Sequence, residues 1–149
     1  MIRRYGSPPV NGKRYRRRPG AYAILPRNGQ VLLTWQGGIH NELQLPGGGI
    51  DPGEGAIAAL HREVFEETGW RIANPVRLGT FRRFAYMPEY DMWAEKVAHI
   101  FVARPVTRLG PPVEAEHTAI WAEPDVAADL IAGAGDAGMV RRYFGLSAK

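Results

Sequence analysis

Three glutamates crowd five consecutive positions in the middle of this 149-residue chain. Glu63, Glu66 and Glu67 are three and four residues apart, so on a helix their carboxylates share one side. Like charges at this spacing repel one another, at a cost of a few tenths of a kcal/mol for each contact. A cation that takes several carboxylate ligands would offset this repulsion.

The helix that carries the glutamates is predicted over residues 52–68. Asp51 can cap it, Pro52 suits its first position, and Gly69 is typical of a helix end. The apolar positions form one stripe, with the glutamates on its flank: Ile57, Leu60 and Val64.

Nothing else on this helix balances the carboxylates. It has no lysine, Arg62 is its only arginine, and the glutamates lie toward its C-terminal half, where the macrodipole disfavours anions. A hard divalent cation, which binds carboxylate and phosphate oxygens, would supply the missing charge. The alternative is a solvated acidic face, which is common on surface helices.

A glycine-rich turn precedes the helix. Gly47, Gly48 and Gly49 have no side chains, so their backbone N–H groups can approach an anionic ligand closely. Alone, such a stretch is more often just a turn. Beside three carboxylates, it indicates a site for a metal and a phosphate group.

Together these residues resemble the Nudix box, as found in MutT-like Nudix hydrolases. Its pattern is Gly, five residues, Glu, seven residues, then Arg-Glu-hydrophobic-any-Glu-Glu-any-Gly-hydrophobic, and the sequence meets it over residues 48–70. The fixed positions are Gly48, Glu54, Arg62, Glu63, Glu66, Glu67 and Gly69, and the hydrophobic ones are Val64 and Trp70. The preceding LPGG, residues 45–48, is also typical of the family.

The resemblance implies an α+β protein with the Nudix fold, an α/β/α sandwich around a mixed β-sheet. It implies that Glu63, Glu66 and Glu67 bind Mg²⁺ or Mn²⁺ and carry the catalysis. Gly48 would add a backbone carbonyl to the metal, and it would bind substrate together with Gly47. Two other residues of the box, Glu54 and Arg62, would form an ion pair that supports the metal-binding helix.

Hydrolysis of a diphosphate needs charge neutralisation and a positioned water more than it needs a protein nucleophile. The residue that acts as general base stays open, because family members use either a box glutamate or a glutamate of a late loop. In this chain the late loop is the segment 111–121. Glu116 is its first candidate and Glu114 its second. The alternative for both is a solvated loop acid.

The substrate markers of the family disagree in this sequence. Tyr86 lies sixteen residues after Trp70, about where dinucleoside polyphosphate hydrolases carry a tyrosine. Pro88 lies eighteen residues after it, about where ADP-ribose hydrolases carry a proline. Tyr86 is a candidate substrate contact. Arg82 and Arg83 alternate across a strand, so one of them is expected to face the phosphates, and Arg82 is the candidate chosen.

The composition excludes several classes of protein. Without cysteine the chain has no disulfide, thiolate zinc site or cysteine nucleophile. No apolar stretch approaches the ~18 residues that span a membrane, and the N-terminus lacks the apolar segment of a secretory signal. We expect a cytoplasmic protein.

The positive charge is concentrated at the N-terminus. Residues 1–18 contain seven basic residues and no acid, whereas residues 19–149 hold twelve basic and fifteen acidic residues, a sum of −3. The basic residues are Arg3, Arg4, Lys13, Arg14, Arg16, Arg17 and Arg18. We therefore divide the chain into a basic arm, 1–18, and a single domain, 19–149. The arm suits RNA or another anion, and the alternative is a solvated terminus.

Strands are predicted on both sides of the glutamate helix, which favours a mixed sheet. They cover residues 20–26, 31–35, 75–87, 96–106 and 118–123, with helices over 125–132 and 136–144. Residues 88–95 are expected to be a polar connection.

The leading hypothesis is a metal-dependent hydrolase of nucleoside diphosphates linked to another group, with nucleoside triphosphates or dinucleoside polyphosphates as substrates. The alternatives are an RNA 5′-end pyrophosphohydrolase, an ADP-ribose or nucleotide-sugar hydrolase, and a Nudix-fold nucleotide sensor without turnover. The intact box argues against the sensor. A homodimer stays open, because no stretch of the sequence identifies an interface.

Overall fold

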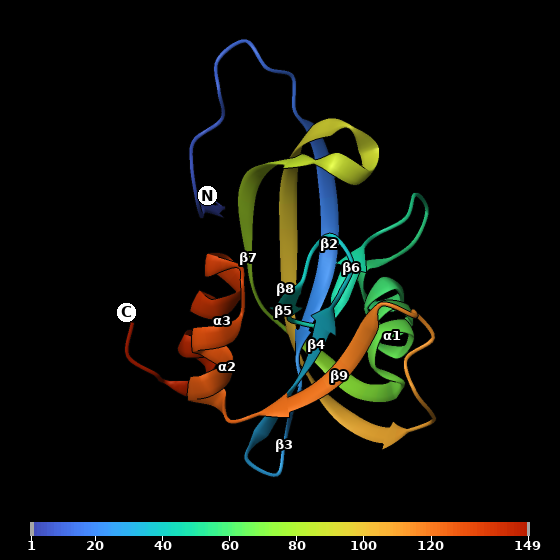
Figure 1. The fold of residues 1–149 in the computed structure, drawn as a ribbon. Coiled ribbons are helices and arrows are strands. Elements are labelled where there is room, and N and C mark those ends of the chain that lie inside the picture. The colour runs from blue at the N-terminus through green and yellow to red at the C-terminus, as the bar shows by residue number, and fades with distance from the viewer. Residues whose placement is uncertain (1, 149) are drawn as a thin grey trace.

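Two β-sheets lie between helices in the computed structural model, which describes residues 2–148 (Figure 1). One sheet has the strand order β1-β7-β8-β2-β6. Its strands are β1 (Arg3–Arg4), β2 (Arg16–Ile24), β6 (Gly47–Gly49), β7 (Trp70–Met87) and β8 (Met92–Arg108). The other sheet is built around β4 (Gln30–Gln36), which pairs with β3 (Pro26–Arg27), β5 (Glu42–Gln44) and β9 (His117–Ala122).

Helices cover both sides of these sheets. α1 (Ala56–Thr68) lies on one side, and α2 (Pro124–Leu130) and α3 (Ala134–Phe144) lie on the other (Figure 1). The larger sheet is mixed, because β2 runs parallel to β8 whereas β7 and β6 are antiparallel to their neighbours β8 and β2. The predicted α+β fold, with helices on both sides of a mixed sheet, is confirmed.

Alternation along β2 builds a separate core under each helical layer. Ala21, Ala23 and Leu25 pack with Leu60 and Val64 of α1. Ile24 faces the opposite way and packs with residues of α2 and α3. Side chains of successive strand residues point to opposite faces, so one strand anchors both layers and fixes α1 against the sheet.

The glutamate helix begins later than predicted. α1 starts at Ala56 behind an N-cap at Gly55 that makes no side-chain hydrogen bond, so the prediction of a start at Pro52 capped by Asp51 is wrong. Gly53, with a φ of +80°, turns the chain before the helix. Glu54 accepts a hydrogen bond from the backbone N–H of Asp51 at 3.0 Å, which closes this turn.

The predicted polar connection over 88–95 is wrong in its second half, because residues 92–95 belong to β8. A single 3₁₀ turn, η1 (Pro88–Tyr90), joins β7 to β8, and strand pairing resumes at once with Met87 opposite Met92. Asp91 makes the tight reversal in a left-handed conformation, with a φ of 45°.

Both ends of the segment predicted as a basic arm pair with the larger sheet. Arg3 and Arg4 lie parallel to Phe81 and Arg82 of β7, and Arg16–Arg18 pair with the start of β8. No helix within residues 2–148 has the length and apolar character that a membrane crossing requires.

Candidate functional site

The glycine turn and the glutamate helix meet at the edge of the larger sheet, where β6 pairs with β2. A Cβ added to Gly48 would lie 2.5 Å from Cδ of Glu63, so this carboxyl group rests directly on the Gly48 backbone. A Cβ on Gly47 would lie 2.2 Å from the carbonyl oxygen of Ala21. Glycine is therefore required at Gly47 by the close approach of the β2 backbone, whereas a Cβ on Gly48 would displace the Glu63 carboxyl group.

Glu67 is the most deeply placed of the three glutamates, with 7% of its surface exposed. Its Oε1 accepts a hydrogen bond from the backbone N–H of Gly47 at 3.0 Å. Burial raises the pKa of Glu67 well above 4.5, and the charges of Glu63 and Glu114 add to this effect against the opposing Gly47 hydrogen bond. A buried carboxylate in such surroundings is stabilised by a cation.

Arg62 takes up much of the negative charge around the helix. Its guanidinium group donates two hydrogen bonds to Glu54, at 2.8 and 2.9 Å, one to Glu63 at 3.0 Å and one to Glu66 at 3.4 Å. The ion pair predicted between Glu54 and Arg62 is thus present, and it lowers the pKa of Glu54 to about 2. Burial nevertheless raises the pKa of Glu63, against the opposing charge of Arg62.

The donor chemistry of this cluster fits a hard divalent cation, because the three glutamates offer only oxygen ligands. Within residues 2–148 no three acidic or histidine side chains already form a ready metal cluster. Arg62 occupies the carboxylates of Glu63 and Glu66 instead. The residues therefore fit Mg²⁺ or Mn²⁺ by type, while their present arrangement is one in which Arg62 supplies the positive charge.

The late loop reaches the C-terminal half of α1. The backbone N–H groups of Val113 and Glu114 donate to the carbonyl of Glu66 at 2.9 and 3.0 Å. The charge of Glu114 raises the pKa of Glu63 and Glu67, so this side chain is electrostatically part of the cluster. Glu116, the first candidate from the sequence, lies against the loop that contains Gly38. A Cβ added to Gly38 would lie 2.9 Å from Oε1 of Glu116.

The sequence did not single out His117 and Thr34, which lie next to Glu67. Nε2 of His117 lies 3.6 Å from Oε2 of Glu67, and its Nδ1 lies 2.8 Å from Oγ1 of the buried Thr34. Burial lowers the pKa of His117, which favours the neutral imidazole at pH 7. Pairing of β4 with β9 brings these residues together, and no local spacing could have indicated it.

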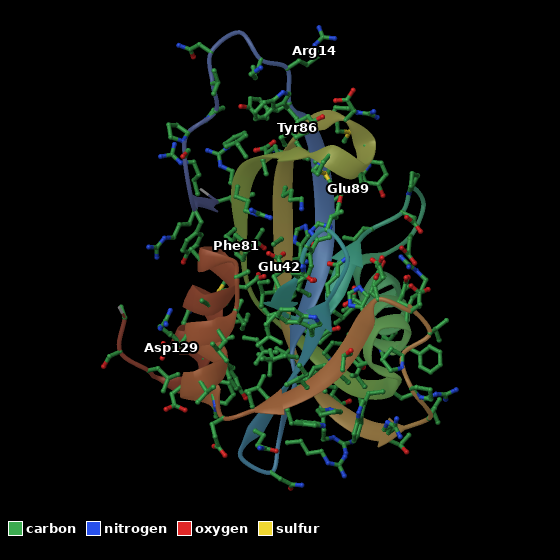
Figure 2. All side chains as sticks on the ribbon, viewed as in Figure 1. Arg14, Glu42, Phe81, Tyr86, Glu89 and Asp129 are labelled. Atoms are coloured by element: carbon green, nitrogen blue, oxygen red, sulfur yellow. The ribbon has the colours of Figure 1, made fainter. Side chains whose placement is uncertain are left out.

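A cavity of about 390 Å³ opens beside the glutamates. Gly47–Gly49, Glu63 and Glu67 form one wall, and the start of α3, including Asp136, contributes to another. Figure 2 shows Glu42 and Phe81, which also line the cavity, near the middle of the molecule. A second hollow of about 490 Å³ over Val76 and Tyr143 has no acidic residue among its described lining, so it lacks the chemistry of the first.

Basic side chains in this cavity could bind phosphates. Arg83 and Lys96 line it, and burial, together with the charge of Arg83, lowers the pKa of Lys96. Neither Arg82 nor Tyr86 is among the described residues that line the cavity. Arg82 pairs with Glu95 at 3.1 Å, and the Tyr86 hydroxyl donates to Asp91. Alternation along β7 thus places Arg83, rather than Arg82, at the cavity.

Comparisons with known proteins identify the family. The model of the NUDIX domain matches residues 14–143. A Bacillus subtilis protein named "Putative 8-oxo-dGTP diphosphatase" is 34% identical over 74 residues, 50% of this chain and 50% of that protein. The RNA pyrophosphohydrolase of Pectobacterium carotovorum is 50% identical over 48 residues, 32% of this chain and 27% of that protein. The matched regions thus span half or less of these relatives.

Solved structures agree on the fold. A NUDIX hydrolase from Nitrosomonas europaea has a TM-score of 0.71 at 20% identity, and the match covers 87% of this chain and 90% of that one. A MutT NUDIX hydrolase from Burkholderia pseudomallei has a TM-score of 0.61 at 24% identity, over 74% of this chain and 85% of that one. Because the family model matches most of its length and the box is complete, the chain belongs to the Nudix hydrolase family.

Proposed function

We propose that the protein is a metal-dependent pyrophosphohydrolase for nucleoside diphosphates linked to another group, with nucleoside triphosphates or dinucleoside polyphosphates as the substrate class. One observation carries the proposal above all. The buried carboxylate of Glu67 and the neighbouring Glu63 line the same cavity as the glycine turn and two basic side chains. Such a cavity suits a phosphate chain that a metal helps to bind.

In this proposal Glu63, Glu66 and Glu67 hold Mg²⁺ or Mn²⁺, and Gly48 offers its backbone carbonyl. When bound, the metal would neutralise charge on the phosphate oxygens and lower the pKa of a water molecule. Arg83 and Lys96, which line the same cavity, would bind the phosphates. The Gly47 N–H holds Oε1 of Glu67 in place, and Nε2 of His117 lies 3.6 Å from its Oε2.

The attacking water must lose a proton as it attacks phosphorus. We take Glu114 as the first candidate for accepting this proton, because its backbone N–H donates to the carbonyl of Glu66 at 3.0 Å and so lies beside the glutamate helix. Glu116, which lies against Gly38, is the second candidate. This order is the reverse of the one proposed from the sequence. We reverse it because the backbone N–H groups of Val113 and Glu114 bind the carbonyl of Glu66.

The relatives support two substrate classes. The name of the Bacillus subtilis relative, a diphosphatase of a nucleoside triphosphate, supports the leading class. Several relatives named RNA pyrophosphohydrolase support a second candidate, removal of pyrophosphate from RNA 5′ ends. The cytoplasmic location and the homodimer considered from the sequence stay predictions.

The test is product release from a panel of nucleoside triphosphates, dinucleoside polyphosphates, ADP-ribose and triphosphate-ended RNA, with Mg²⁺ or Mn²⁺. We expect Glu67→Gln to lower kcat by about 10²–10³-fold, the scale of losing one preorganised charge-stabilising group. Glu123→Gln, at an exposed acid just before α2, is the matched control and should retain full activity.

Full activity of Glu67→Gln would overturn the assignment of the metal ligands. Binding of a nucleotide by the wild-type protein without any metal-dependent product would instead favour the sensor alternative.

A further inference from the structure

A surface beyond the cavity combines basic and aromatic side chains at one end of the molecule. We call it the arm surface, and it consists of Lys13, Arg14, Tyr15, Arg16, Arg18, Tyr86, Tyr90 and Trp93. Figure 2 shows Arg14 and Tyr86 at this end, with Glu89 of η1 beside them. Parallel pairing of β2 with β8 brings the two sequence regions together, since Arg16 lies opposite Ala94.

Most aromatic rings of the arm surface contact another ring, and the Tyr90 ring is contacted by Arg18. Tyr15 packs edge-on against Phe84 and Trp93, with ring centroids 5.0 and 6.0 Å apart, and Tyr86 lies 5.3 Å from Trp93. Tyr86 and Tyr90 are nevertheless 43% and 57% exposed. Exposed rings that are already ordered can stack on bases at little cost in conformational entropy.

Cations lie directly against these rings. Nζ of Lys13 is 4.6 Å from the ring centroid of Trp93, and the guanidinium carbon of Arg18 is 4.8 Å from that of Tyr90. Rings and cations side by side suit a single-stranded polynucleotide, which offers bases for stacking and phosphates for the cations. An acidic peptide would use the cations and leave the exposed rings without a partner.

Most of these cations are available to a ligand. Lys13, Arg14 and Arg16 are exposed, and none of them forms an ion pair with another residue in the range 2–148. Arg17 differs, because it pairs with Glu95 at 3.2 Å, so it is left out of the arm surface. The surface thus keeps a net positive charge next to a domain whose remaining residues sum to −3.

The arm surface is continuous with the cavity. Arg18 and Tyr90, which form one of its cation–ring pairs, also line the cavity that contains Glu63 and Glu67. A chain bound along the arm surface can therefore extend past Arg18 and Tyr90 into the cavity that contains Glu63 and Glu67. A mononucleotide in the cavity, in contrast, has no need of Lys13 or Arg14.

We infer that the arm surface binds a single-stranded polynucleotide whose 5′ end enters the cavity. The direction of the strand rests on the proposed function, because hydrolysis of a terminal phosphate chain requires that end at the glutamates. Binding along the surface does not rest on it. RNA and DNA share the chemistry that the surface recognises, and the experiment distinguishes them.

The experiment measures fluorescence anisotropy of single strands of about twelve nucleotides, within the range of known site sizes. The strands carry a 3′ label and a 5′ hydroxyl, so binding needs neither a terminal phosphate nor turnover. RNA and DNA of one sequence are compared over a series of salt concentrations. The test variant combines Lys13→Gln, Arg14→Gln and Arg16→Gln.

The matched control removes three exposed arginines at the far end of the β7–β8 hairpin: Arg71→Gln, Arg104→Gln and Arg108→Gln. Each contact between a cation and a single-strand phosphate changes log K by about 0.7 for each tenfold change in salt, a factor of about 5. Loss of three contacts should therefore weaken binding about 100-fold at 0.1 M salt and flatten the salt slope by about 2. The control should bind like the wild type, and both variants should hydrolyse mononucleotides at the wild-type rate.

Tighter binding of RNA than of DNA would identify RNA as the ligand, and equal binding would extend the assignment to any single strand. Equal weakening in the two variants, or no binding by the wild type at low salt, would overturn the inference. So would equally tight binding of polyglutamate, which would point to an acidic protein. Absence of hydrolysis would refute the proposed function alone, because the strand-binding result does not depend on it.

Discussion

The Glu63 carboxyl group lies so close to Gly48 that a methyl side chain at position 48 would displace it. A Cβ on Gly48 would lie 2.5–2.7 Å from the three carboxyl atoms of Glu63, and it would have to push that carboxylate away. The displaced group is the end of a flexible side chain, so we expect Gly48→Ala to change stability by less than about 1 kcal/mol. We expect kcat to fall about 10–100-fold, as for other disturbances of a metal ligand's position.

Gly49→Ala is the matched control for this variant. Its added Cβ would have no neighbour within 4 Å, and its φ is not positive, so activity should stay close to the wild type. Steady-state kinetics with Mg²⁺ and urea denaturation of the three proteins test both parts. Equal losses in the two variants would show that backbone flexibility of the turn, rather than the position of Glu63, sets the rate.

The sequence could predict those site residues that lie close to one another along the chain. Glu63, Glu66 and Glu67 are close because they share helix turns, and Glu54 and Arg62 are eight residues apart. Thr34 and Asp136 could not be found in this way, since strand pairing and helix docking bring them to the site from distant parts of the chain. The choice between Arg82 and Arg83 depended on strand alternation, which a sequence gives only relative to an unknown starting face.

Among the elements, α1 is positioned from its C-terminal end. Gly69 caps the helix in a left-handed conformation, with a φ of 78°, and its N–H donates to the carbonyl of Phe65 at 2.8 Å. A Cβ on Gly69 would lie 1.9 Å from the carbonyl oxygen of Gly110, in the segment that leads to the late loop. This contact between backbones holds the end of the helix against the loop that contains Glu114.

We expect Gly69→Ala to lower the free energy of unfolding by about 2–4 kcal/mol, because it combines an unfavourable backbone conformation with a clash that no side chain can relieve. Gly145→Ala is the matched control, since Gly145 caps α3 with a φ of 67° and a Cβ there meets nothing within 4 Å. The control should lose only about 1 kcal/mol. Equal losses in urea denaturation would contradict the role assigned to the contact with Gly110.

Element boundaries were harder to predict than element types. The end of α1 at Gly69 was predicted correctly, because a left-handed glycine is a local signal. Its start was not predicted correctly, because Glu54 closes the turn at Asp51 and binds Arg62, and the helix begins only after it. Likewise β8 begins earlier than expected, because pairing with β7 extends both strands to the reversal at Asp91.

In the molecule as a whole, several acids are protonated more readily in the folded state than in the unfolded chain. Burial raises the pKa of Glu63 and Glu67 above 4.5, and that of Asp136 from 3.8 to about 6. Arg83 and Lys96 oppose the rise at Asp136, and Glu42 adds to it. A raised folded pKa gives stability that is complete below the unfolded pKa and is lost as the pH rises through the folded value.

We therefore expect deprotonation of these three acids to destabilise the metal-free protein as the pH rises from about 4 to 7. His99 and His117, whose pKa burial lowers, act in the opposite direction over the same range. Mg²⁺ should restore the stability lost at Glu63 and Glu67 by taking the place of their protons. At about 100 times its Kd, Mg²⁺ contributes about 2.7 kcal/mol, which corresponds to a rise in Tm of about 5–10 °C for a chain of this size. At pH 5, where protons compete for the same carboxylates, the rise should be less than half as large.

Thermal unfolding at pH 5 and pH 7.5, with MgCl₂ or with NaCl of equal ionic strength, measures this difference. The double variant Glu63→Gln/Glu67→Gln should be at least as stable as the metal-free wild type at pH 7.5, because it removes two charges that burial disfavours. It should also lose the response to Mg²⁺. If Mg²⁺ raised Tm equally at both pH values, or stabilised the variant as well, the ion would act elsewhere on the protein, and the carboxylates on α1 would need another explanation.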